Sequence, residues 1–104
     1  MRIVALFSLR EGVDPAAYEA WAQTTDLPTV RGLGSVAGFH VLAATGVLGS
    51  DAAPPYAYVE IIEVADMDRF GQDVAGDTVQ RVAAEFRAFA DNPVFLLTRE
   101  LGAP

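Results

Sequence analysis

The order of β-like and helical segments constrains this chain more than any other feature. Four segments are typical of strands: the apolar run at 2–9, the alternating segments at 36–45 and 56–64, and the short stretch at 94–99. The segment 2–9 contains few polar residues, which indicates a central strand that is buried on both faces. Two helical segments lie between the strands, one after the first strand and one before the last.

Capping residues predict where the helices begin. Asp14 followed by Pro15 predicts one start, because the Asp side chain caps free amides and proline fits the first turn. That helix is expected to run to about Gln23 and to end at 26–28, since the residue before Pro28 avoids the α region. Asp66 predicts the second helix.

The second helix is expected over 67–90, with apolar residues near helical spacing. Gly71 and Gly76, with Asp77 as a fresh cap, leave open a division into two helices. Asn92 and Pro93 are expected to stop the helix before the last strand.

The resulting order is strand, helix, strand, strand, helix, strand. It predicts one α+β domain over 1–104, of ferredoxin-like βαββαβ design, with a four-stranded antiparallel sheet and its helices on one face. The other sheet face would be bare, while 52% of the residues are hydrophobic and the mean hydropathy is +0.28. We therefore predict a homodimer in which a second copy covers that face.

Charge and composition exclude several function classes. The net charge of −7 opposes nucleic acid and anionic membrane, because binding to phosphates depends on Lys and Arg. No export signal or membrane-spanning segment is recognisable, so a cytoplasmic location is expected. The chain has no cysteine and one histidine without a spaced ligand set, and it has no dinucleotide or phosphate-binding motif. We expect neither a metal nor a cofactor.

Three side chains are candidates for acid–base catalysis. His40 is the only histidine, the residue type whose unperturbed side chain can act as an acid or a base near neutral pH, although a half-buried structural histidine explains it equally well. Asp26 could orient His40, or it could be a solvated carboxylate at a helix end. Glu60 lies mid-strand among apolar residues, where burial would raise its pKa, unless an arginine pairs with it at a subunit interface.

Five further residues are candidates for binding a small molecule. Tyr18 and Trp21 lie three apart on the first helix and form either an aromatic wall for a flat ligand or part of the core. Arg31 could hold an anionic group or simply solvate the surface. Ser8 and Tyr58 are lesser polar candidates.

Several short runs carry a resemblance to a known family. They are YEAW at 18–21, DLP at 26–28, GFHV at 38–41, YVEIIEV at 58–64, and NPVF at 92–95 after Phe86 and Phe89. Together they resemble the RedY-like (HapK-type) proteins over nearly the whole chain. The resemblance implies a dimeric α/β barrel that works without a cofactor in prodiginine-type or bisindole alkaloid (antibiotic) biosynthesis.

The activity implied by the resemblance is guidance of a reactive pyrrole or indole intermediate through cyclisation, condensation or dehydration. In this interpretation His40 shuttles a proton with help from Asp26 or Glu60, and Tyr18 and Trp21 stack on the substrate. Two alternatives stay open. One is a cofactor-independent monooxygenase of aromatic compounds, and the other is a non-catalytic carrier of a labile intermediate or a dimer without a substrate.

Overall fold

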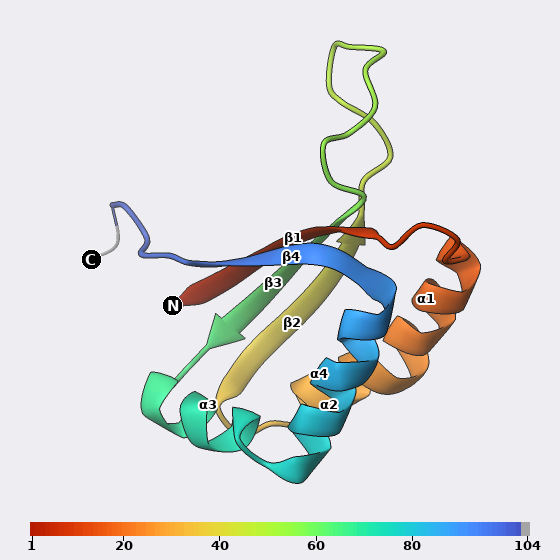
Figure 1. The fold of residues 1–104 in the computed structure, drawn as a ribbon. Helices are drawn as coiled ribbons and strands as arrows, with labels where there is room; N and C mark the ends of the chain where they lie inside the picture. Colours follow the sequence, from red (N-terminus) through yellow and green to blue (C-terminus); the bar gives the residue numbers. More distant parts are fainter. Residues whose placement is uncertain (103–104) are drawn as a thin grey trace.

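The computed structural model describes residues 1–102, and its four strands form one antiparallel sheet in the order β2-β3-β1-β4 (Figure 1). The strands are β1 (Arg2–Leu9), β2 (Val36–Ala43), β3 (Tyr58–Val64) and β4 (Ala90–Leu97). The helices are α1 (Pro15–Trp21), a π-helical turn (Ala22–Asp26), α2 (Leu27–Arg31), α3 (Met67–Val74) and α4 (Asp77–Phe89). The predicted α+β, ferredoxin-like fold is confirmed.

The expected end of the first helix at 26–28 is wrong. The backbone stays helical through Pro28 to Arg31, and Leu27 has α-region angles of −57° and −52° although proline follows it. The helix can accommodate Pro28 because the turn before it is π-helical, and the missing N–H then falls in the first turn of α2.

The expected stop at Asn92 and Pro93 is also wrong. Helix α4 already ends at Phe89, and both residues lie within β4. Asn92 has a φ of 44° where the pairing of β4 with β1 shifts register, and Pro93 is tolerated because β4 is an edge strand. The division of the second helical segment into α3 and α4 is confirmed, with the break at Ala75 and Gly76.

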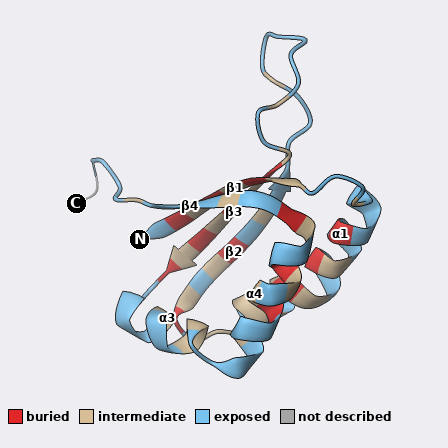
Figure 2. Cartoon of the chain, viewed as in Figure 1, coloured by how far each residue is buried: buried red, intermediate tan, exposed pale blue. Residues whose placement is uncertain are grey.

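The core lies between the sheet and the helices (Figure 2). Its largest cluster is aromatic: the ring of Phe7 stacks on Tyr58 at 5.5 Å and meets Phe86 edge-on at 4.9 Å. A second cluster lies further along the same face and contains Ile3, Phe39, Ile62 and Val64. In each inner strand, therefore, every second side chain enters the core.

The intervening side chains form the opposite sheet face, which we call the outer face. Its apolar members are Val4, Leu6, Leu42, Val59, Ile61, Val94 and Leu96, which pair with one another across the four strands. The described residues contain no helix that covers them, and Leu42, Val94 and Leu96 are exposed. The bare apolar face that the element order predicted is thus present.

Candidate functional site

A π-helical turn places Asp26 inside the protein. The backbone N–H of Leu27 donates to the carbonyl of Ala22, five residues earlier. Such a turn holds one residue more than an α-helical turn, and it rotates everything that follows it. Asp26 is consequently only 6% exposed, although it belongs to the helical segment 15–31, whose two ends lie at the surface.

Glu60 reaches the same point from the sheet. It lies in the middle of β3 between Tyr58 and Ile62, on the face toward the helices, and is 4% exposed. Its neighbours across the sheet are Ala5 and Val41, which are small enough to leave room beside it. The carboxyl group of Glu60 lies beside that of Asp26, close enough for each to shift the pKa of the other.

Two carboxyl groups in contact and out of water cannot both stay ionised at neutral pH. Burial, together with the nearby charge of Asp26, raises the pKa of Glu60 to about 8. Burial also raises the pKa of Asp26 to about 6. Near pH 7 the pair therefore holds one proton, so that it can both donate and accept a proton.

Tyr18 completes the polar cluster. Its side chain is fully buried, and its hydroxyl lies near Glu60, acting to lower the pKa of that residue. The hydroxyl is nevertheless not aligned with any acceptor, and Oε1 of Glu60 also lacks a partner among residues 1–102. Burial raises the pKa of Tyr18, so its hydroxyl stays protonated. Buried polar atoms without partners are uncommon, and they indicate a place where a ligand or water belongs.

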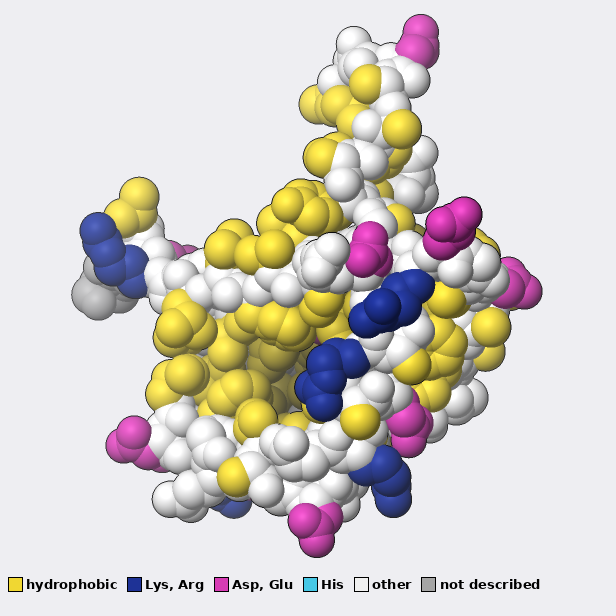
Figure 3. Space-filling model, viewed as in Figure 1, with side chains coloured by type: hydrophobic (Ala, Val, Ile, Leu, Met, Phe, Trp, Pro, Cys, Tyr) yellow, Lys and Arg dark blue, Asp and Glu magenta, His cyan; other side chains and the backbone are white. Residues whose placement is uncertain are grey.

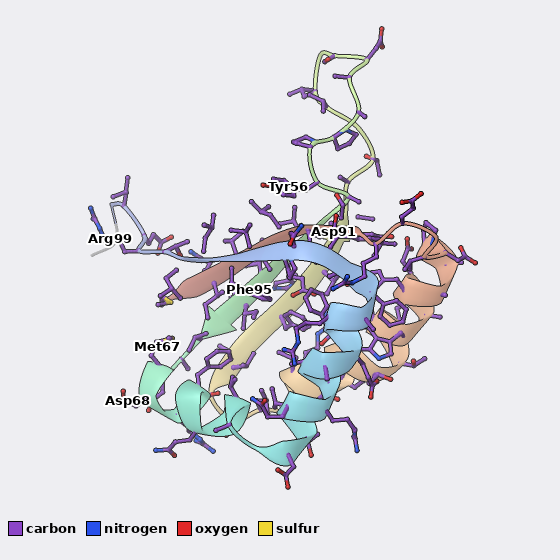
Figure 4. All side chains as sticks on the ribbon, in the orientation of Figure 1. Tyr56, Met67, Asp68, Asp91, Phe95 and Arg99 are labelled. Atoms are coloured by element: carbon purple, nitrogen blue, oxygen red, sulfur yellow. The ribbon has the colours of Figure 1, made fainter. Side chains whose placement is uncertain are left out.

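An apolar cavity of about 120 Å³ adjoins the carboxyl pair. Asp26 and Glu60 line it together with side chains from β3, α3, α4 and β4, among them Ile62, Phe70, Val82, Phe86 and Phe95. Figure 3 shows the surface hollowed and lined by hydrophobic side chains between β4 and α3. Figure 4 shows Phe95 pointing from β4 toward this hollow, and its ring lies 6.2 Å from that of Phe86. The pair is thus reached through an apolar mouth.

A second cavity of about 110 Å³ lies on the other side of Tyr18. Glu19, Gln23 and Tyr58 give it a polar lining, and the Tyr58 hydroxyl donates to Glu19 at 2.8 Å. A wider depression of about 720 Å³ lies at the far end of the sheet, where Arg2 pairs with Glu63 and Glu100. The charged groups there are exposed and paired with one another, so the buried pair of Asp26 and Glu60 is the stronger candidate for a functional site.

Comparison with known proteins gives the family. The pattern of a family described as "REDY-like protein HapK" matches residues 1–101. The chain belongs to the HapK family. The crystal structure of HapK from Hahella chejuensis is similar at 28% identity and a TM-score of 0.74, over 100% of this chain and 96% of that one. No protein of curated function matches.

Other similar structures share the fold at lower identity. The Arabidopsis thaliana protein At3g17210 has a TM-score of 0.81 at 14% identity, over 99% of this chain and 97% of that one. SnoaB, a cofactor-independent oxygenase from Streptomyces nogalater, has a TM-score of 0.71 at 18% identity, over 98% and 96%. At these identities the likeness extends to the fold alone.

In this HapK-family chain His40 lies away from the cavity. Its neighbour Phe39 enters the core, so His40 points to the outer face, where its Nε2 lies 3.8 Å from Oε2 of Glu63. The expected pairing of Asp26 with His40 is wrong, because the sheet separates them. The alternative in which an arginine pairs with Glu60 at an interface is also wrong, since Glu60 faces the helices and contacts Asp26.

The candidate binding residues have structural partners. Trp21 packs on Phe86 and Phe89, and its Nε1 donates to Glu85 at 2.8 Å. Arg31 donates to the carbonyl oxygen of Phe39 at 3.1 Å. Ser8 accepts a hydrogen bond from the amide of Ala57 at 3.2 Å. Tyr18 and Tyr58 line the second cavity. The sequence did not identify the residues of α4 and β4 that line the apolar cavity. Their apolar side chains recur at the same spacing as core residues, so the pattern predicts only burial.

Two structural findings bear on other kinds of site. Within residues 1–102, no three His, Asp or Glu side chains gather in a way that could hold a metal ion. In the same part of the chain, every helix is too short or too polar to cross a membrane.

Proposed function

We propose that this HapK-family protein is a cofactor-independent acid–base enzyme of secondary metabolism that acts on a reactive pyrrole or indole intermediate of prodiginine or bisindole type. The observation that carries the proposal is the proton-sharing pair of Asp26 and Glu60 at the wall of an apolar cavity. The alkaloid setting is what the resemblance to RedY-like proteins implies.

The pair would supply one proton and remove another. In a dehydration, the protonated carboxyl group donates to the leaving hydroxyl as the C–O bond breaks, and water departs. The ionised carboxylate then takes a proton from the ring nitrogen or the adjacent carbon, whose electrons form the new double bond. Cyclisation and condensation need the same exchange of protons. The apolar walls hold the substrate and keep bulk water from a reactive intermediate.

This proposal assigns proton transfer to Asp26 and Glu60 rather than to His40. We further propose that the working form is a homodimer joined through the outer face, because that face is apolar and no helix of the described chain covers it. His40 would then lie at the interface, beside Glu63. A solved neighbour of this fold is described as a dimeric ferredoxin-like protein.

The test is turnover of the intermediate by matched variants. Glu60→Gln and Asp26→Asn are expected to lower turnover by about 10²- to 10⁴-fold, the usual contribution of a general acid or base. His40→Gln is the control and should keep most of the activity. The product distribution would be followed by mass spectrometry. Full activity in Glu60→Gln would refute the proposal.

A second candidate is oxygen-dependent chemistry on an aromatic substrate, which the similar fold of the cofactor-independent oxygenase SnoaB favours. Oxygen uptake that accompanies turnover without added flavin or metal would select it. Turnover that is unchanged under anaerobic conditions would favour the redox-neutral reaction. Binding without conversion, equal in wild type and Glu60→Gln, would indicate a carrier.

A further inference from the structure

The long connection between β2 and β3 projects away from the rest of the molecule. Residues 44–57, which we call the arm, stand clear of the sheet and of the helices (Figure 1). Within residues 1–102, one hydrogen bond joins the arm to the body, from the amide of Ala57 to Oγ of Ser8 at 3.2 Å. A single chain therefore supplies few contacts that would hold the arm in one position.

The arm is apolar for a segment so far from the core. Its one charged residue is Asp51. At a tight turn the amide of Ser50 donates to the carbonyl of Val47 at 3.1 Å, and the φ of 72° at Gly49 is the kind that such turns require. This turn presents Leu48 to solvent with 103% exposure. Apolar side chains that gather on one projecting segment indicate a surface that another molecule covers.

The segment that follows β4 carries groups that complement those of the arm. Residues 98–102, which we call the tail, are held to the start of β1, because Oγ1 of Thr98 donates to the carbonyl of Arg2. Leu101 is 77% exposed. Arg99 is exposed too, and it forms no ion pair within residues 1–102. The tail thus offers one cation and one apolar side chain, while the arm offers one anion and one apolar side chain.

The arm and the tail of one chain lie at opposite ends of the sheet. The ladder between β1 and β3 runs from the pair Arg2 and Glu63 at the tail to the pair Phe7 and Tyr58 at the arm. These pairs are separated by roughly 17 Å along the strands. Figure 4 shows Arg99 on the tail at the far end of the sheet from the arm. A contact between arm and tail must therefore involve two chains.

The proposed dimer can bring the arm of one chain to the tail of the other. Two sheets that pack face to face keep their strands nearly aligned, and a twofold axis then leaves two arrangements. Strands that run in the same direction would place one Asp51 beside the other. Strands that run in opposite directions place Asp51 beside Arg99 of the partner subunit, and Leu48 beside Leu101 of the partner subunit. Complementary charges favour the second arrangement.

The reach of the two segments agrees with this arrangement. A hairpin with about seven residues in each leg extends roughly 20 Å, and about five extended residues span roughly 17 Å. Arm and tail therefore project by similar distances beyond the sheet, and they can lie along each other over most of their length.

We propose that the arm of each chain packs along the tail of a second copy of this chain, so that the dimer is held at both ends as well as through the outer face. The proposal rests on the homodimer proposed above. It concerns how the two copies are joined and is independent of the chemistry at Asp26 and Glu60.

Cross-linking between differently labelled chains tests the contact. The chain has no cysteine, so Leu48→Cys and Leu101→Cys each create a single reactive site on an exposed residue. The two variants would be mixed, allowed to exchange subunits and treated with a flexible bismaleimide. We expect a covalent dimer in the mixture, with mass spectrometry linking the peptide of residue 48 to that of residue 101. Neither variant alone should give this product.

The control replaces Leu101→Cys by Gln72→Cys, on the exposed surface of α3. A mixture of this variant with Leu48→Cys is expected to stay uncross-linked, because α3 lies on the helix side of the sheet. Cross-linking in Leu48→Cys alone would place arm beside arm and would overturn the proposal.

Charge reversal tests the ion pair separately. Asp51→Arg and Arg99→Asp are each expected to raise the dissociation constant of the dimer roughly fivefold, measured by analytical ultracentrifugation, since two exposed ion pairs are lost in each dimer. The double variant restores opposite charges and should return to the wild-type value. A double variant as weak as the single variants would overturn the pairing.

The outcomes separate this proposal from the others. A wild-type dimer without the cross-link between residues 48 and 101 would refute the contact of arm and tail alone. A monomeric wild type would refute both this contact and the outer-face dimer. Neither result bears on the turnover of Glu60→Gln, which tests the proposed chemistry.

Discussion

At the scale of single residues, two neighbouring tyrosines differ in what their hydroxyl groups contact. The rings of Tyr18 and Tyr58 lie 4.8 Å apart in the core. The Tyr58 hydroxyl donates to Glu19, whereas the Tyr18 hydroxyl is buried and has no aligned partner within residues 1–102. A buried polar group lowers stability when it is unpaired and raises it modestly when it is paired.

The two tyrosines therefore predict opposite effects of losing the hydroxyl. We expect Tyr18→Phe to raise the free energy of unfolding by about 1 kcal/mol, and Tyr58→Phe to lower it by about 1 kcal/mol. Urea denaturation of the two variants beside the wild type measures both changes. A clear loss of stability in Tyr18→Phe would mean that its hydroxyl has a partner, such as a water that bridges it to Glu60.

The carboxyl pair predicts how stability depends on pH. The pKa of Glu60 is about 8 in the folded protein, against an ordinary value of 4.5, so the folded state binds more protons than the unfolded state between these values. The free energy of unfolding should therefore fall as the pH rises from about 4.5 to 8, by up to about 1.4 kcal/mol per pH unit. The raised pKa of Asp26 acts in the same direction up to about pH 6.

The comparison variant is Glu60→Gln, which cannot titrate. The difference in unfolding free energy between wild type and Glu60→Gln, measured by denaturant titration at several pH values, should change steadily over this window and level off above it. A difference that is constant with pH would show that Glu60 has an ordinary pKa.

At the scale of elements, the π-helical turn decides which way Asp26 faces. Asp14 and Pro15 predict the start of the helix, but no residue in 22–26 marks a π-helical turn. The turn buries Ala22 and Asp26 on one side of the helical segment. Because the turn contains one extra residue, its loss should rotate the chain that follows by about 100°.

Deletion of Thr24 tests this explanation. Thr24 is exposed, and its removal is expected to convert the turn to α-helix and to move Asp26 away from Glu60. The pKa of Glu60 should then fall, because the charge of Asp26 contributes to raising it. Carbon-13 NMR of the Glu60 carboxyl group across pH measures the change. Thr24→Ala keeps the chain length and is the control, so equal titration in both variants would contradict the role of the turn.

At the scale of the whole molecule, the outer face is the main apolar surface that the helices of the described chain leave uncovered. Ile61 lies at its centre, paired with Val4 on one side and His40 on the other. Most other members of this face are aliphatic, and burying aliphatic surface contributes about 25 cal/mol per Å². A second copy is the simplest partner for such a face.

The proposed dimer predicts the effect of a charge at this centre. Wild-type protein is expected to have twice the chain mass by light scattering at micromolar concentration, and Ile61→Asp is expected to have the mass of one chain, because a charge without a partner is costly in an apolar interface. Gln72→Asp on the exposed surface of α3 adds the same charge elsewhere and should stay dimeric. A monomeric wild type would refute the dimer.

The sequence by itself determined the order of the elements, the fold and the family, because caps and apolar periodicity are local signals and the family motifs span the chain. It also singled out Glu60, since a carboxylate among apolar neighbours is unusual wherever it folds, and it singled out Asp26 only as a possible partner of His40. Only the tertiary structure decided that these two meet while His40 faces the other way. The physical reason is that contact between a side chain of a helix and one of a strand depends on how each element is rotated about its axis. Here the π-helical turn sets the direction of Asp26, and the choice of the buried sheet face sets that of Glu60.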